Sequence, residues 1–257
     1  MTGFRTLLLK ESVEAWRSRR VVAVAILFVV LGIVSALTAR YLPEILKLAL
    51  GDQLTVPLPA PTPADAVLQL QKNLGQIGAL VAIVLAMGAV ATEKERGTAA
   101  FVLTKPVSRG AFLGAKLAAL GAVLGLATLA AVAAAWAYAA ILFEPGPILG
   151  WLALAVFAWL SLAAWASVTF LASTVSGSAA VAAGVGVVAL ITVSLVGAIP
   201  QAARFLPAGL DAPGRALATT GTAGPDAGAL ATAVAGTIVL IIGSAVLAWL
   251  SFRRQEL

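Results

Sequence analysis

The sequence contains no cysteine and no histidine, and it has only two methionines, one of them the first residue. These absences exclude disulfides, thiolate or imidazole metal sites, cysteine nucleophiles and any serine–histidine triad. They also leave no side chains for a copper relay. Enzymatic chemistry would have to rest on carboxylates, lysine, serine or tyrosine. We therefore expect no catalytic site, no metal and no cofactor.

Charge is equally scarce, since only 11% of the 257 residues are charged while 61% are hydrophobic. Soluble domains are about one quarter charged, so the surplus apolar surface must face lipid. A bilayer core of about 30 Å needs about 20 largely apolar helical residues. Six stretches meet or approach this length: 21–37, 74–91, 111–143, 149–172, 179–199 and 227–252. The sequence predicts an all-α, polytopic membrane protein with six transmembrane helices in one domain, 1–257.

The basic residues indicate the orientation. With the N-terminus placed inside, the inner segments hold 12 of the 17 lysines and arginines and the outer segments hold 5. Cytoplasmic loops carry the excess of these residues, so we predict that both termini are cytoplasmic and that the protein lies in the inner (cytoplasmic) membrane. Because the net charge of +6 lies mostly beside apolar runs, it favours a membrane surface over nucleic acid as the partner.

The first 20 residues have a pattern of their own. Apolar residues recur at helical spacing, namely Phe4, Leu7, Leu8, Ala15 and Trp16. This spacing favours an amphipathic helix over 1–20 that lies in the inner interface, although an ordinary basic flank remains an alternative. A secretory signal peptide over 1–39 is a further alternative. The long polar lead-in, with Glu11 and Glu14, argues against it.

The segment 93–109, between the second and third spans, is dense in charge and too short to be a domain. Residues 98–105 have the length of about two helical turns, and Pro106 should end that helix. Ser108 is a candidate N-cap for the third span. A short helix edged with charged residues suits docking into a partner's groove. A plain connector with positive-inside charges is the alternative.

This segment resembles the first cytoplasmic loop of ABC-2 class transporter permeases. The resemblance is carried by Glu93-x-Glu95-Arg96-Gly97-Thr98, then Leu103-Thr104-Lys105-Pro106-Val107-Ser108-Arg109 and Gly114-Ala115-Lys116. The frame is also similar: a basic amphipathic N-terminus, six spans and an arginine-rich end. Within the class, the chain is loosely similar to the permease of nitrous-oxide-reductase maturation systems.

The resemblance implies a permease subunit of an ATP-driven exporter, working as a homodimer. Each subunit would seat segment 93–109 as a coupling helix in a separate ATP-binding cassette ATPase subunit. The residues carried over to that contact are Glu93, Glu95, Arg96, Gly97, Thr98, Phe101, Pro106 and Arg109. It also implies a partly re-entrant segment at 200–207, where a simple outer loop is the alternative. The chain has no Gly-x-x-x-x-Gly-Lys-Ser/Thr phosphate loop, so ATP hydrolysis is expected on the partner.

Two other functions fit the topology. A non-transport scaffold or accessory subunit of a membrane complex would share the six spans but need no ATPase. An intramembrane enzyme would need histidine or paired acidic residues that the spans lack. The shortage of ionisable residues within the spans also argues against a proton-coupled transporter or a selective ion channel.

Overall fold

The fold is a bundle of long helices. The computed structural model describes residues 3–50, 60–105, 107–144, 146–224 and 227–255, and no strand occurs among them. The described residues include six helical segments that are long and apolar enough to cross a membrane, which confirms the predicted all-α, six-span class. They are Arg20–Ala49, Pro63–Glu95, Arg109–Leu142, Ile148–Ser176, Ala179–Gly197 and Gly228–Arg253.

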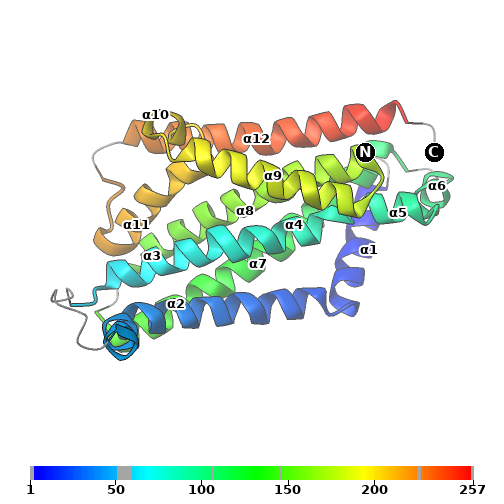
Figure 1. Cartoon of the computed structure of the whole chain (residues 1–257). Coiled ribbons are helices and arrows are strands. Elements are labelled where there is room, and N and C mark those ends of the chain that lie inside the picture. The colour runs from blue at the N-terminus through cyan, green and yellow to red at the C-terminus, as the bar shows by residue number, and fades with distance from the viewer. Residues whose placement is uncertain (1–2, 51–59, 106, 145, 225–226, 256–257) are drawn as a thin grey trace.

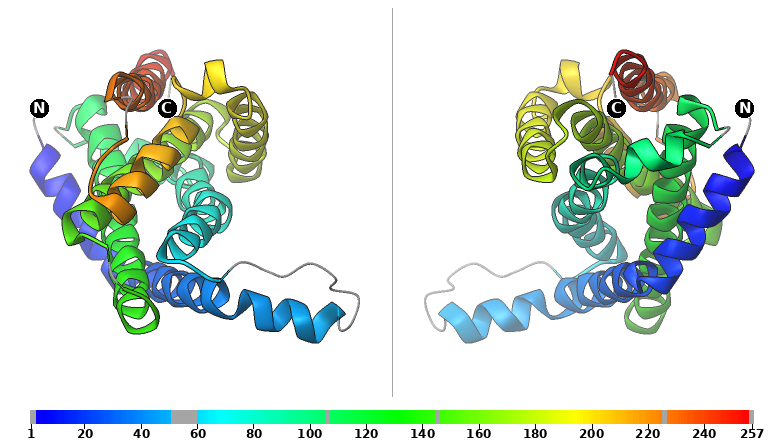
Figure 2. Two further views of the ribbon diagram at one scale, coloured as in Figure 1. Left: turned by 90° about the vertical axis from the view of Figure 1, so that its left-hand side faces the viewer. Right: turned by 90° about the vertical axis from the view of Figure 1, so that its right-hand side faces the viewer.

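Both termini lie at one end of the bundle, which we call the terminal end (Figure 1). The predicted N-terminal helix is present as α1, Phe4–Arg17, and it runs crosswise to the spans at this end. α2, Arg20–Leu50, follows α1 after a sharp corner at Arg19, whose φ is 57°. α2 continues well past the expected boundary at residue 37. Its last turns bend away from the bundle (Figure 2). Pro43 lies inside this helix, and a proline inside a helix removes a hydrogen bond and kinks it.

The second span is built from several helical pieces. α3, Pro63–Asn73, begins with a capping box in which Thr62 and Asp65 bond reciprocally. A short π-helix, η2, Leu74–Gly78, joins it to α4, Ala79–Met87. Two short helices then emerge at the terminal end, α5, Ala91–Glu95, and α6, Thr98–Leu103.

α8 is the central helix. α7, Arg109–Leu142, packs against both α2 and α8, Ile148–Ser176, while α4, α9, Ala179–Gly197, and α12, Ala227–Arg253, also pack on α8. The largest fully buried side chains of this core are phenylalanines, Phe28, Phe112, Phe170 and Phe252. Small residues let the backbones approach, as at Gly32, where an added Cβ would lie 2.2 Å from the Ala131 carbonyl oxygen.

At the opposite end, the segment after α9 turns back onto the bundle. α10, Pro200–Ala203, and η3, Pro207–Leu210, lead into α11, Asp211–Thr220, which packs on α8 and contacts α3. An added Cβ at Gly150 would lie 1.8 Å from the Leu217 carbonyl oxygen, so the two backbones touch. The segment therefore packs against α8 as far as Thr220, and its re-entrant character stays a prediction.

Candidate functional site

The charged segment predicted to dock a partner forms α5 and α6 at the terminal end of the bundle. Gly97, between them, has φ of 69°, a left-handed conformation that glycine adopts without steric cost. Ser108 caps α7, since its hydroxyl accepts a hydrogen bond from the Ala111 N–H at 3.1 Å. Pro106, which was expected to end the coupling helix, lies outside the described residues.

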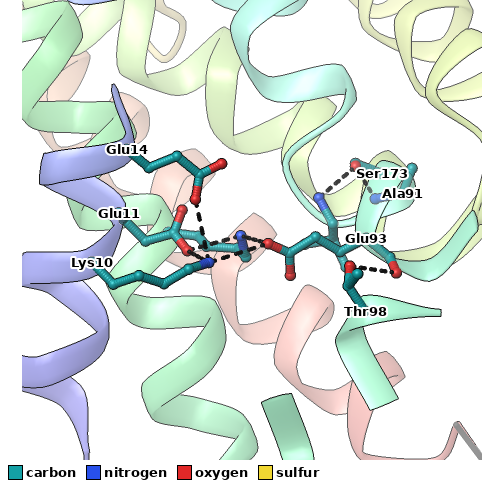
Figure 3. Close-up of polar contacts among 9 residues, drawn as sticks. Lys10, Glu11, Glu14, Ala91, Glu93, Thr98 and Ser173 are labelled. Carbon is teal, nitrogen blue, oxygen red and sulfur yellow. Dashed lines mark hydrogen bonds and ion pairs between the residues drawn. The ribbon is translucent and has the colours of Figure 1, made fainter. Parts of the chain in front are cut away.

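Ser173 of α8 fixes the start of α5. The buried Ser173 hydroxyl oxygen accepts hydrogen bonds from the backbone N–H groups of Val90 and Ala91, at 3.2 and 3.0 Å (Figure 3). Val90 is the N-cap residue of α5 and Ala91 its first residue, and N–H groups at a helix start lack partners within the helix. Lys94 adds a second anchor, because its Nζ donates to the Thr174 carbonyl at 2.9 Å. Movement of α5 must therefore displace the end of α8 or break these bonds.

A second set of contacts joins α5 to α1 and α7. We call it the Lys116 cluster, and it consists of Lys10, Glu11, Glu93 and Lys116. The Lys116 side chain is only 5% exposed, and its Nζ lies 2.7 Å from Glu93 Oε1 and 3.1 Å from Glu11 Oε1. Lys10 Nζ lies 3.1 Å from Glu11 Oε1 and 3.6 Å from Glu93 Oε1. A buried charge is tolerable only when it is paired, so the cluster holds three elements in one arrangement.

The carboxylates of this cluster raise the pKa of Lys10. Burial by itself lowers the pKa of Lys10, but Glu11, Glu93 and Glu14 favour the charged form more strongly, so the pKa lies above its usual 10.5. Glu93 Oε2 is also buried and accepts no hydrogen bond from the described residues. The Glu93 carboxylate therefore bonds into the bundle and does not belong to the exposed face of the loop.

Five of the other residues predicted to contact the partner lie at the surface of the protein. Glu95, Arg96, Gly97 and Thr98 are exposed, and Phe101 is 67% exposed; we call these five residues the α5–α6 surface. Lys105 lies 5.6 Å from the centre of the Phe101 ring. An exposed aromatic side chain among charges is typical of a contact surface.

Arg109 points away from the α5–α6 surface. Its Nη1 donates to the carbonyl oxygens of Phe252 and Gln255, both at 2.8 Å, and of Arg253 at 3.1 Å. A cation at a helix C-terminus satisfies carbonyls that have no partner within the helix. Arg109 therefore fixes the end of α12 to the start of α7.

Sequence reasoning did not assign a role to Glu11, Lys116 or Ser173. A signal was present for Lys116, because an ionisable residue inside an apolar span usually has a buried partner. Its partners come from positions 105 and 23 residues away. Ser173 gave no such signal, since a serine in a span most often bonds its own helix.

The comparisons with known proteins agree with this architecture. Residues 5–257 match the family described as "ABC-2 family transporter protein". The chain is also 27% identical over 213 residues to the "Uncharacterized transmembrane protein YxlG" of Bacillus subtilis (strain 168), covering 81% of this chain and 82% of that protein. With the family match spanning nearly the whole chain and six apolar helices to cross the membrane, the chain belongs to the ABC-2 family of transporter proteins, as a multi-pass membrane permease subunit.

Proposed function

We propose that this chain is the permease of an exporter and that its α5–α6 surface docks a separate ATP-binding cassette ATPase. The observation that carries the proposal is the division of the loop into two faces. One face is exposed and holds Phe101 among charged residues, while the other is bonded into the bundle through Glu93. A docking element needs both an accessible contact and a firm internal connection.

The internal connections suggest how ATPase movement reaches the spans. A displacement of α5 passes to α8 through the Ser173 and Lys94 hydrogen bonds. The same displacement passes to α1 and α7 through the Lys116 cluster. Because close-packed helices move as rigid elements, a small shift of the loop then changes the packing of several spans. The ATPase and both termini lie on the cytoplasmic side in this proposal, and the direction of transport, export, follows from the family resemblance.

Affinity purification from mild detergent tests the docking. The variant Arg96→Glu/Phe101→Ala removes the exposed ring and reverses one charge. A matched control exists at the opposite end, where Arg204 lies 4.8 Å from the ring centre of the exposed Phe205. Arg204→Glu/Phe205→Ala therefore makes the same chemical change away from the loop.

We expect wild type and the control to retain a partner that photoaffinity labelling with an azido-ATP probe identifies as ATP-binding. The Arg96→Glu/Phe101→Ala variant should lose it, with an unchanged melting temperature of the permease. Retention of the ATPase by this variant would contradict docking through the α5–α6 surface. If no ATP-binding protein co-purifies with the folded wild type, the proposal fails and a non-transport scaffold becomes the better interpretation of this chain.

We also propose that two copies pair along α9. This span is the least buried of the six, and its exposed residues Val181, Val185, Val188 and Leu195 recur at the spacing of one helix face. Gly184 on the same helix leaves open space where a partner can approach. Since the chain has no cysteine, Val188→Cys provides a unique cross-linking site. We expect Val188→Cys to form a disulfide-linked dimer and Val239→Cys, at a similarly exposed site on α12, to form none. The reverse result would place the dimer interface at α12 instead of α9.

A further inference from the structure

α1 has two apolar faces with different surroundings. Phe4, Leu7 and Leu8 pack into the core of the bundle. Leu9, Val13 and Trp16 are 58%, 50% and 66% exposed and recur at i, i+4 and i+7, so they form one outward stripe. In a membrane protein, an outward apolar stripe on a helix that runs crosswise to the spans is typical of burial in the lipid interface.

Three arginines follow this stripe directly. Arg17 ends α1, Arg20 begins α2, and Arg19 forms the corner between them; we call these three residues the basic corner. All three are exposed. Among the described residues, no carboxylate forms a salt bridge with any of them, and the nearby Glu14 is paired with Lys10 at 3.4 Å. The basic corner therefore carries three positive charges that the described protein leaves uncompensated.

The start of α2 fixes the depth of the basic corner in the membrane. Val22, Ile26, Val30 and Val34 are exposed along one face of α2, and such a face contacts hydrocarbon. The first of them lies only two residues after Arg20. Since hydrocarbon contact begins there and α1 runs crosswise at the terminal end (Figure 1), the three guanidinium groups lie at the level of the lipid headgroups.

We propose that the basic corner, with the outward stripe of α1, binds the phosphate headgroups of anionic phospholipids. Guanidinium groups form paired hydrogen bonds with phosphate, and three of them favour a lipid with net negative charge over a zwitterionic one. The adjacent Trp16 occupies the interfacial position that tryptophan prefers. An acidic protein surface is a poorer occupant, because it would have to exclude lipid from the start of α2.

Lipid binding at the basic corner also affects the docking loop through α1, an inference that rests on the proposed function. Lipid contacts one side of α1, and on another side Glu11 pairs with Lys116 at 3.1 Å. Lys116 in turn pairs with Glu93 of the docking loop. An anionic lipid at the basic corner therefore holds α1 in the position that completes the Lys116 cluster.

Binding of short-chain lipids to the purified, detergent-solubilised protein tests the proposal without any transport assay. The probes are dioctanoyl phosphatidylglycerol, dioctanoyl phosphatidylcholine and inorganic phosphate. The variants are Arg17→Gln/Arg19→Gln/Arg20→Gln and the corresponding triple lysine variant. Lys47→Gln/Lys72→Gln/Arg204→Gln is the control, because it removes three exposed positive charges elsewhere.

Wild type should bind phosphatidylglycerol more tightly than phosphatidylcholine, and its affinity should fall as salt screens the charges. Each arginine contributes about fivefold at low salt, so the triple glutamine variant should lose about a hundredfold in affinity. The lysine and control variants should retain most of the affinity. If the triple variant does not fold, Arg17→Gln alone should show the single-residue loss. Equal binding of the two lipids would overturn the proposal, as would equal losses in variant and control. If free phosphate binds tightly and neither lipid does, the ligand of the basic corner is a soluble anion and not a lipid.

Discussion

Lys116 Nζ and Glu93 Oε1 lie 2.7 Å apart, although 23 positions separate the two residues. The pair connects a span, α7, to the short helix α5 that emerges at the end of the bundle. Glu11 approaches the same Nζ from α1. One buried ammonium group thus sets the relative positions of three helices, and this arrangement makes the following effects measurable.

Lys116→Met should destabilise the protein. The substitution leaves Glu11 and Glu93 near each other, largely buried, and Lys10 is the one cation among the described residues that still pairs with them. Removing one partner of a buried pair costs about 3–5 kcal/mol, and the partial exposure of the carboxylates reduces this to about 2–3 kcal/mol. Denaturant unfolding in detergent measures the loss, with the exposed Lys47→Met as the control. The triple variant Glu11→Gln/Glu93→Gln/Lys116→Met should recover most of it; no recovery would mean that the charges are not the cause.

Ser173→Ala should weaken the connection between α5 and α8. It leaves two buried N–H donors, those of Val90 and Ala91, without their acceptor, at a cost of about 2 kcal/mol. Ser167→Ala is the control on the same helix, because among the described residues the buried Ser167 hydroxyl bonds only to the Ala163 carbonyl of its own helix. We expect a lower melting temperature and faster hydrogen exchange at residues 90–95 for Ser173→Ala alone. Equal behaviour of the two variants would show that Ser173 does not anchor the loop.

Gly32→Ala should separate α2 from α7. Its Cβ would meet the Ala131 carbonyl oxygen at 2.2 Å, and backbone atoms cannot move aside as a flexible side chain does. Overpacking of this kind costs about 1–3 kcal/mol. At Gly243 in α12 nothing lies within 4 Å of an added Cβ, so Gly243→Ala should be neutral or should stabilise its helix by about 0.5–1 kcal/mol. The difference in melting temperature between the two variants tests the close approach.

Asp211 should make stability depend on pH. Although the residue keeps exposed surface, the surrounding protein desolvates its carboxyl and raises the pKa to about 6, while Arg215 opposes the shift. Because the folded state then binds the proton more tightly than the unfolded state, stability from this group is highest below about pH 4 and falls as pH rises through 6.

Melting temperatures at pH 5 and pH 7.5 measure this dependence. Asp211→Asn should remove much of the difference between the two values and raise stability at pH 7.5. The hydrogen bond from Gln71 Nε2 should persist, since it goes to the backbone carbonyl of residue 211. An unchanged pH dependence in Asp211→Asn would assign the effect to another group.

The spans could be predicted because each is a local property. A helix in lipid satisfies its own backbone groups, so a sufficiently long apolar run specifies its structure without reference to the rest of the chain. Ser108 was predictable as the cap of α7 for the same reason, since a cap needs only neighbouring residues. The length of α2 was underestimated, because the residues after 37 are less apolar but still favour a helix, and Pro43 bends this helix without ending it.

The site was predicted less completely. Of the residues that the family resemblance assigned to the partner contact, Arg96 and Phe101 are exposed, and their role there stays a prediction. Glu93 and Arg109 belong to the same segment, but their side chains bond into the bundle instead. Nothing in a local pattern distinguishes these two groups, because the direction of a side chain depends on which helices lie beside it.

The sequence by itself determined that this protein is a helical membrane protein of six spans with a charged, partly helical loop after the second. Hydrophobic length and charge placement act on each segment separately, which is why they could be interpreted without a structure. Only the tertiary structure decided that Lys116 bridges α1 and α5, that Ser173 holds the loop, and that Gln71 bonds a carbonyl 140 residues away. Such contacts depend on the relative positions of helices, and these are set by packing among residues distant in the chain.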